Sequence, residues 1–275
     1  MFTSPEAQNS NSETWYGQGT ALYDIGHYES AIAKFDQVLN QNPHNWESWI
    51  HRGYALFELK SYEMALESFQ AALSLNGKSV LAWHGLGIVQ AKQGDYEAAL
   101  SSFERAVACD PSDAKAWYNL ANAKLHLDQF IEAISSFERA IKLRPNHYRS
   151  WYNKAIALAS VRRYKQALDS LDTTLTLKRD CYYAWNYRGF VLNKMKRFED
   201  AIASFDISLK YREDNPNAWY GRAVTYALQD KADQSAHNLQ KAIQLSPQLY
   251  RMMVKTDPSF THVRQASAVQ ALIQE

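Results

Sequence analysis

Tryptophan recurs at one fixed interval along most of this sequence. Seven of the eight Trp residues follow one another at steps of 34 residues. They are Trp15, Trp49, Trp83, Trp117, Trp151, Trp185 and Trp219. A regular recurrence of a rare residue is typical of a repeat architecture, in which each unit buries its apolar face against its neighbours. The sequence therefore predicts an array of stacked repeats with a distributed core.

Small residues predict two close-packed helices in each repeat. Residues 15–43 contain two stretches with helical spacing, separated near Gly26, which permits a tight turn. Four places after each Trp stand Gly19, Gly53, Gly87, Ala121, Ala155, Gly189 and Ala223, and twelve places further on stand Ala31, Ala65, Ala99, Ala133, Ala167, Ala201 and Ser235. Gly inside a helix costs about 0.5 to 1 kcal/mol relative to Ala. We therefore expect the two small positions to face each other across a helical hairpin.

The second helix of each repeat carries large apolar residues at helical spacing. One of its positions holds Phe35, Phe69, Phe103, Phe137, Leu171, Phe205 and Leu239. We interpret these residues as core and not as a cofactor site. Pro43, Pro111, Pro145, Pro247 and Gly77 close five second helices. Because Arg179 and Glu213 stand at this place in the fifth and sixth repeats, we expect an altered join there, with a small kink between repeats six and seven.

The balanced composition narrows the classes of function. With 30 basic and 29 acidic side chains, the overall field favours neither nucleic acid nor a membrane surface, although stacking of a single strand on exposed aromatic residues stays open. Cys109 and Cys181 are too few for a disulfide framework and too far apart for a zinc site. The sequence has no phosphate loop, nucleophile motif or paired-His spacing, and no apolar span or signal peptide. We expect a cytoplasmic protein with no enzymatic activity, metal or cofactor.

The pattern as a whole resembles the tetratricopeptide repeat: a Trp, a Gly or Ala four residues later, an Ala in the second helix, an aromatic residue four places beyond it and a closing Pro. The resemblance covers residues 12–249 as seven repeats, at 12–45, 46–79, 80–113, 114–147, 148–181, 182–215 and 216–249. It implies an all-α fold, an α-solenoid in which antiparallel helix pairs form a right-handed superhelix. It also implies a concave groove, lined by the first helices, that receives an extended peptide or a helix of a partner protein, as in adaptors and scaffolds.

The two ends of the chain depart from the repeat. Residues 1–11 are polar, so we predict a disordered leader followed by a helix that starts after Ser12. The pattern fails after Leu249, and Asp257–Pro258 interrupts the helix. Further on, an apolar helix face is predicted from Phe260, Val263, Val269, Leu272 and Ile273. Because an array needs a cover for its last apolar face, we predict that residues 250–275 form capping helices; the alternative is a docking helix for a second subunit.

The family's groove positions select candidate peptide-binding residues on the first helices. They are Tyr16, His51, Tyr54, Phe57, His84, Ile88, Lys115, Tyr118, Asn119, Asn122, Arg149, Tyr152, Asn153, Tyr183, Asn186, Tyr187, Phe190 and Tyr220. The charges on these helices change sign along the chain, from Glu13, Asp24, Glu47 and Glu58 to Lys92, Lys115, Arg149 and Lys194. If these charges line the groove and are not merely solvated helix faces, a ligand of opposite polarity would be steered into one orientation.

Two further features bear on the ligand. The Asn side chains among the candidates can both donate to and accept from a peptide backbone. Gly17, Gly85 and Gly221 each follow an aromatic residue, which leaves either pockets for apolar anchors or gaps that neighbouring helices fill. A carboxylate clamp is disfavoured, because His84 and Ile88 stand where that version of the fold has Lys and Asn. The leading prediction is an adaptor that binds a partner protein or peptide, and the alternative is a self-assembling, homo-oligomeric scaffold.

Overall fold

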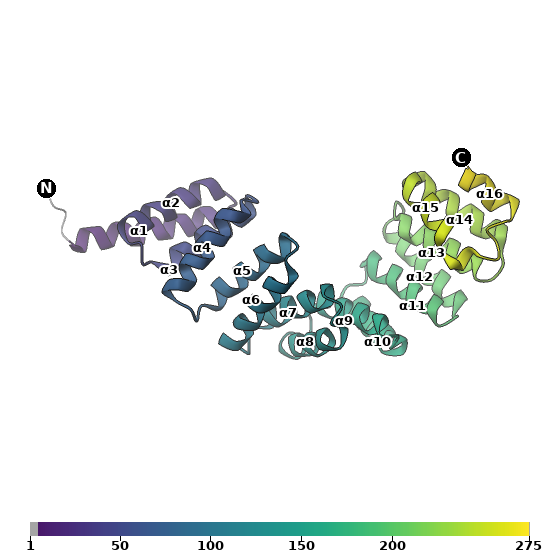
Figure 1. The fold of residues 1–275 in the computed structure, drawn as a ribbon, viewed down its shortest axis with the longest axis horizontal. Coiled ribbons are helices and arrows are strands. Elements are labelled where there is room, and N and C mark those ends of the chain that lie inside the picture. Colours follow the sequence, from purple (N-terminus) through teal and green to yellow (C-terminus); the bar gives the residue numbers. More distant parts are fainter. Residues whose placement is uncertain (1–4, 275) are drawn as a thin grey trace. The chain divides into compact units, whose positions relative to one another are not determined.

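The computed structural model describes residues 5–274, with side chains described for residues 11–273. Within that range the chain is all-helical, without a strand, and successive helices pack as antiparallel pairs (Figure 1). The chain divides into two compact units, Met1–Arg144 and Pro145–Glu275. None of the described helices is long and apolar enough to cross a membrane. The predicted all-α class of paired helices is confirmed.

The first unit contains four helix pairs. They are α1 (Pro5–Asp24) with α2 (Tyr28–Gln41), α3 (Trp46–Glu58) with α4 (Tyr62–Leu75), α5 (Val80–Lys92) with α6 (Tyr96–Cys109), and α7 (Ala114–His126) with α8 (Phe130–Leu143). Helix α1 begins at Pro5, eight residues before the helix predicted to start after Ser12, so the structure places residues 5–11 in a helix where a disordered leader was predicted. Residues 1–4 lie outside the described chain. Pro5 suits the first turn of a helix, since its fixed φ is already helical and its missing N–H would have no partner there.

The second unit contains three helix pairs and a C-terminal segment. The pairs are α9 (Tyr148–Ser160) with α10 (Tyr164–Leu177), α11 (Tyr182–Lys194) with α12 (Phe198–Tyr211), and α13 (Pro216–Ala227) with α14 (Ala232–Leu245). The segment consists of α15 (Pro247–Thr256), the 3₁₀ turn η1 (Pro258–Phe260) and α16 (Ser267–Gln274).

In the repeats that have Gly at the small position of the first helix, this Gly faces the large core residue of the second helix. A Cβ added to Gly53 would lie 2.8 Å from Phe69 Cε1, and one added to Gly19 would lie 2.7 Å from Phe35 Cε1. Both Phe side chains are completely buried. The side chain nearest to the Gly is therefore the aromatic core ring, and this packing offsets the cost of Gly in a helix. In the seventh repeat the two small positions also meet as expected, because the Ser235 hydroxyl donates to Ala223 O at 2.9 Å.

The turn within each pair contains one residue with a left-handed backbone. Gly26 and Gly94 occupy this place in two repeats, with φ of 81° and 86°. In the others it is held by Lys60, Asp128, Arg162, Lys196 and Asp230, with φ between 57° and 60°. The Ser61 N–H donates to Leu56 O, which is the bond that closes a helix C-terminus around such a residue. The tight turn predicted at Gly26 is confirmed, and it recurs without Gly in five repeats.

The recurring Trp ties the join between consecutive repeats. The indole N–H donates to the backbone carbonyl six residues earlier, and the acceptors are Pro43, Gly77, Pro111, Pro145, Arg179 and Glu213, at 2.9 to 3.0 Å. Because the acceptor is a backbone carbonyl, Arg179 and Glu213 serve as well as Pro. This hydrogen bond is the same at Arg179 and Glu213 as in the other repeats, so it does not show the altered join that we expected there.

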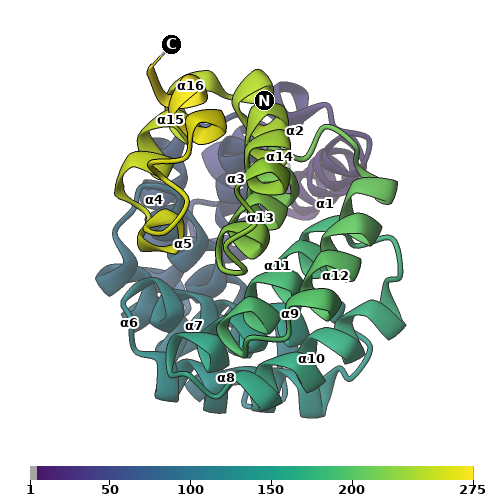
Figure 2. The ribbon, with the colours of Figure 1, turned by 90° about the vertical axis from the view of Figure 1, so that its right-hand side faces the viewer.

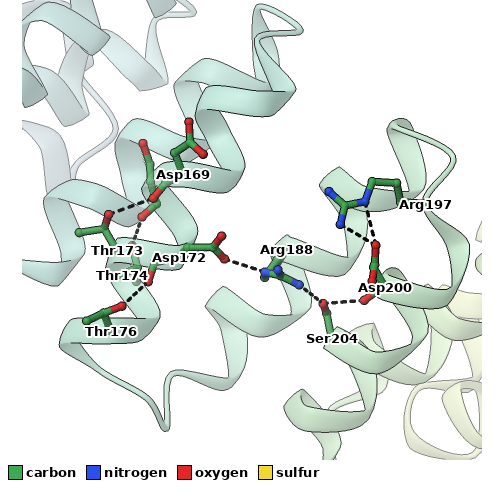
Figure 3. A network of polar contacts seen from close by, with 10 residues as sticks. Asp169, Asp172, Thr173, Thr174, Thr176, Arg188, Arg197, Asp200 and Ser204 are labelled. Carbon is green, nitrogen blue, oxygen red and sulfur yellow. Dashed lines mark hydrogen bonds and ion pairs between the residues drawn. The ribbon is translucent and has the colours of Figure 1, made fainter.

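Half-buried arginines form a second link between repeats. Arg188 of α11 donates from Nε to Asp172 Oδ1 of α10 at 2.8 Å and from Nη1 to Ser204 Oγ of α12 at 2.8 Å (Figure 3). Arg52 makes the same two bonds to Asp36 and Ser68, each at 2.7 Å. One guanidinium therefore joins the second helices of two successive repeats, with a charge-assisted bond to each.

The C-terminal segment covers the apolar end of the last repeat, where α15 and α16 lie against α14 (Figure 2). One buried cluster combines Leu239 and Ile243 of α14 with Tyr250, Val254, Phe260, Val263, Val269 and Ile273. Residues 258–266 form a 3₁₀ turn and irregular turns, so the continuous helix face predicted from Phe260 onward begins only at Ser267. Arg264 supports these turns by donating to Val254 O and Asp257 O.

Candidate functional site

The candidate binding residues lie on the first helices, but in two separate units. Tyr16, His51, Tyr54, Phe57, His84, Ile88, Lys115, Tyr118, Asn119 and Asn122 belong to α1, α3, α5 and α7 of the first unit. Arg149, Tyr152, Asn153, Tyr183, Asn186, Tyr187, Phe190 and Tyr220 belong to α9, α11 and α13 of the second. Each unit thus presents its own set.

The start of the first unit joins aromatic and acidic groups. The His51 ring stacks on Phe35 with centroids 5.7 Å apart, and Tyr16 meets it edge-on at 5.5 Å. Burial lowers the pKa of His51, although Glu47 and Asp24 act in the opposite direction. Phe57 is half-buried against Tyr62 at 5.8 Å. The predicted acidic residues Glu47 and Asp24 therefore lie around the His51 imidazole, which stays neutral near pH 7.

A chain of hydrogen bonds centred on the buried His84 links three first helices in the middle of the first unit. Asn119 Nδ2 of α7 donates to His84 Nε2 of α5 at 2.6 Å. His84 Nδ1 lies 3.2 Å from Tyr54 Oη of α3, and the Tyr54 hydroxyl donates to Leu81 O at 2.9 Å. An imidazole that carries its proton on Nδ1 satisfies all three bonds. Burial, with the charge of Lys115, lowers the pKa of His84 to about 4.

These hydrogen bonds change the role of three predicted residues. His84 is 4 % exposed, so it is not available for direct contact with a partner, contrary to the prediction. The Tyr54 hydroxyl and the Asn119 amide N–H are also engaged within the protein. These groups fix the positions of α3, α5 and α7 relative to one another.

A pocket of about 440 Å³ opens between α5 and α7, next to the hydrogen bonds of His84 and Asn119. We call it the α5–α7 pocket; it is lined by Ile88, Ala91, Lys92, Tyr96, Phe103, Tyr118, Asn119, Asn122, Ala123 and His126. The Tyr96 and His126 rings stack in its wall, 4.2 Å apart and 9° from parallel. The pocket brings together four of the candidate residues, Ile88, Tyr118, Asn119 and Asn122. Lys115 is exposed at the start of α7.

The second unit has an aromatic cluster, which we define as Tyr148, Tyr152, Tyr183, Tyr187 and Phe190. The Tyr152 ring meets Tyr183 edge-on at 4.8 Å and Tyr187 at 6.0 Å, and Tyr187 stacks with Phe190 at 5.4 Å. Burial raises the pKa of Tyr187 to about 12, so its phenol is neutral. Phe190 is 43 % exposed, which leaves a large apolar ring at the surface.

Cations border the aromatic cluster. Lys194 Nζ lies 5.3 Å from the centre of the Phe190 ring, within the range of a cation–π contact. Lys178 Nζ and Arg149 Cζ lie 5.1 Å and 5.8 Å from the centre of the Tyr148 ring. Hydrogen bonds from Tyr183 and Arg149 lower the pKa of Tyr148. The cluster therefore has positive charge at both of its ends.

Some candidate residues lie elsewhere. Tyr220 is 7 % exposed, packs on Tyr250 and Phe260, and donates to Asp257 Oδ2 at 2.8 Å. The C-terminal segment therefore covers it, contrary to its prediction as a groove residue. Asn153 is half-buried on α9, and Asn186 Oδ1 is buried on α11 without a hydrogen-bond partner.

The gaps predicted beside Gly85 and Gly221 are filled. A Cβ on Gly85 would lie 2.3 Å from Phe69 Cε1, and one on Gly221 would lie 2.4 Å from Phe205 Cε1. Each ring comes from the preceding repeat. Gly17 lies in the first of the seven repeats, and a Cβ there would meet nothing within 4 Å. Of the two possibilities that the sequence left open, filling by a neighbouring helix therefore holds at Gly85 and Gly221.

Three residues of these surfaces were missed from the sequence: Tyr96, Tyr148 and Lys178. Tyr96 begins a second helix, and Lys178 follows one, so neither stands at a groove position of the family. Tyr148 and Tyr182 are the only aromatic side chains other than Trp46 at the first place of a repeat. That departure was the one available signal for Tyr148.

Comparisons with known proteins agree with the repeat geometry. The profile of the tetratricopeptide repeat matches residues 16–80, 84–147, 118–179 and 191–250, which is well over half of the chain. The profile of the protein prenyltransferase alpha subunit repeat matches residues 164–195 alone. A comparison with curated proteins finds no match.

Solved structures with a similar fold include several repeat proteins. A tetratricopeptide repeat protein from Parabacteroides merdae is 16 % identical, with 90 % of this chain and 98 % of that chain covered and a TM-score of 0.67. YrrB, described as a tetratricopeptide repeat protein with an unusual peptide-binding site, is 22 % identical, with 69 % and 98 % covered and a TM-score of 0.57. The Cut9–Hcn1 hetero-tetramer of the APC/C is 14 % identical, with 93 % and 47 % covered and a TM-score of 0.65. At these identities the likeness is one of fold. With the profile matches, the Trp-tied helix pairs identify the chain as a member of the tetratricopeptide repeat family.

Proposed function

We propose that this protein is a non-catalytic interaction module that binds a peptide or a helix of a partner protein on its first helices. The observation that carries the proposal is the α5–α7 pocket, which combines apolar and aromatic walls with the amide of Asn122. Pockets of this kind bind side chains through apolar contact and orient them with a few polar groups. As part of the same proposal we place the protein in the cytoplasm, where the thiols of Cys109 and Cys181 would stay free.

Rigidity of the pocket supports the proposal. The hydrogen-bond chain through His84 fixes α3, α5 and α7, so the α5–α7 pocket exists before a partner arrives. Binding to a preformed surface avoids much of the entropy lost when a site must be ordered.

A peptide array of mixed composition, probed with the full chain, tests this function. Asn122→Arg places a long side chain in the α5–α7 pocket and should abolish retention of the peptides that the pocket binds. Ser135→Arg adds the same side chain to the exposed face of α8, where Ser135 bonds only its own helix, and should leave retention unchanged. An array that retains no peptide, or equal retention by both variants, would contradict the proposal.

Self-assembly remains the second candidate, and one observation favours it. Leu249 and Met252 of α15 are 47 % and 60 % exposed, so the capping segment has an apolar outer side. Light scattering after size-exclusion chromatography would report a dimer for the full chain and a monomer for Leu249→Asp/Met252→Asp. A monomer at all concentrations in both would exclude this candidate.

A further inference from the structure

Acidic residues are distributed unevenly in the second unit. The first helices α9, α11 and α13 contain no Asp or Glu. The second helices contain Asp169, Asp172, Glu199, Asp200, Asp206 and Asp233. The turns and the C-terminal segment contain Asp180, Glu213, Asp214, Asp230 and Asp257. A surface made from the first helices of this unit therefore has cations without a carboxylate of its own.

Some of these cations already have partners in the framework. Arg188 and Arg222 pair with Asp172 and Asp206 of the preceding second helices, at 2.8 Å and 3.1 Å. Lys194 of α11 differs, and so does Lys178, which follows α10 in the turn that also contains Asp180: among the described residues neither lysine takes part in an ion pair. An ammonium group has three N–H donors. When it lies over an aromatic ring, the donors that do not face the ring stay available for other contacts. Lys194 over Phe190 and Lys178 over Tyr148 are thus ready to bind anions.

From these observations we infer that the aromatic cluster of the second unit binds an acidic segment of a partner protein, one in which an apolar side chain is flanked by carboxylates. The apolar side chain would contact the exposed ring of Phe190 and the edge of Tyr187. The carboxylates would contact Lys194 at one end of the cluster and Arg149 and Lys178 at the other. This inference rests on the proposed function and specifies its ligand chemistry. The recognition is by side chains, so a free C-terminal carboxylate is not needed.

The observations favour a protein segment over a nucleic acid. Single-stranded nucleic acid also stacks on aromatic rings, but it presents a phosphate at every nucleotide and is held by an extended basic groove. The cluster is bordered by three cations, in a chain whose net charge is +1. Three cations around exposed aromatic rings match a few carboxylates interspersed with apolar side chains.

Fluorescence anisotropy with the full chain tests the inference. The probe is a short labelled peptide in which Glu alternates with Phe and Leu and whose C-terminus is amidated; the comparison peptide has Gln at every Glu. We expect the Glu peptide to bind more tightly than the Gln peptide, and the difference to shrink as salt is added. Lys194→Glu should weaken binding of the Glu peptide about tenfold, because an attraction becomes a repulsion.

Two further variants locate the site. Lys210→Glu makes the same charge change on the exposed side of α12 and should leave the affinity within about twofold. Phe190→Ala should weaken both peptides, since an exposed aromatic anchor is lost. Circular dichroism of each variant reports whether the helices are intact; Phe190 and Lys194 are exposed, so their replacement leaves the core filled.

Several outcomes would overturn the inference. They are equal binding of the Glu and Gln peptides, no binding of either, equal effects of Lys194→Glu and Lys210→Glu, or tighter binding of a labelled oligo-dT than of the Glu peptide. If the array described above still retains other peptides, the inference alone has failed and the proposed function stands. If the array retains none, both have failed.

Discussion

Two glycines at the same place in the repeat should respond to one substitution with opposite signs. Gly85 of α5 and Gly17 of α1 both stand two residues after the recurring Trp. A Cβ on Gly85 would lie 2.3 Å from Phe69 Cε1 and 2.4 Å from Phe69 Cζ, whereas a Cβ on Gly17 would meet nothing within 4 Å. Phe69 is completely buried and packs edge-on against Tyr54 at 5.0 Å, so its ring has little freedom to move.

The magnitudes follow from two opposing effects. Replacing Gly with Ala in a helix stabilises by about 0.5 to 1 kcal/mol. Forcing an extra methyl into a filled core destabilises by about 1 to 3 kcal/mol. Gly17→Ala experiences only the first effect and should raise the free energy of unfolding by about 0.5 to 1 kcal/mol. Gly85→Ala experiences both and should lower it by about 1 kcal/mol, so the two variants should differ by about 2 kcal/mol.

Urea unfolding followed by circular dichroism measures the difference. The midpoint should shift up for Gly17→Ala and down for Gly85→Ala, at equal slope. Gly221→Ala repeats the test in the second unit, where the Cβ would lie 2.4 Å from Phe205 Cε1. If Gly85→Ala and Gly221→Ala stabilise as much as Gly17→Ala, the Phe rings do not fill these gaps, and the pockets predicted from the sequence would be present after all.

The remaining predictions concern His84, Arg188 and the C-terminal segment. His84 has a pKa of about 4 in the folded protein and 6.5 when unfolded, so the unfolded chain binds the proton first as the pH drops. The free energy of unfolding should therefore fall by about 3 kcal/mol between pH 6.5 and 4, relative to His84→Gln. Urea-unfolding stabilities of the two proteins that run parallel across this range would contradict the assigned burial. Arg188→Ala should lower the free energy of unfolding by about 1 to 2 kcal/mol through loss of two charge-assisted bonds, and Arg105→Ala on the exposed side of α6 is the control. Phe260→Ala should cost about 3 to 5 kcal/mol, read as a lower thermal midpoint; a change below 1 kcal/mol would mean that the C-terminal segment does not seal the last repeat.

The helix pairs could be predicted from the sequence because the same residue pattern recurs in each of the seven repeats. A single Trp or Gly would decide little, but Trp117 and its six counterparts fix the period, and the period fixes which residues share a helix. Helix α1 was predicted less well, since residues 5–11 have no apolar pattern and their helix depends on continuing the turns that follow.

The candidate surfaces could be predicted only in part, because exposure depends on what the neighbouring element contributes. His84 and Tyr220 occupy the same place in their repeats as Tyr152. His84 is buried by Tyr54 and Asn119 on both sides, and Tyr220 is buried by the C-terminal segment, while Tyr152 joins the aromatic cluster. The repeat pattern predicts the direction of all three side chains, and only the packing distinguishes a structural residue from one that a partner can reach.

This contrast gives a physical rule for finding specificity in such an array. A side chain whose polar groups and apolar surface are satisfied by adjacent repeats stabilises the framework, whatever its position suggests; Asn119 and Arg188 are of this kind. A side chain that the framework leaves unsatisfied has free energy to gain from a partner. Phe190 and Lys194 meet that condition together, one with an exposed ring and the other with a charge that no described carboxylate pairs. Binding specificity in the second unit should therefore depend on these two residues more than on the Asn positions that every average repeat shares.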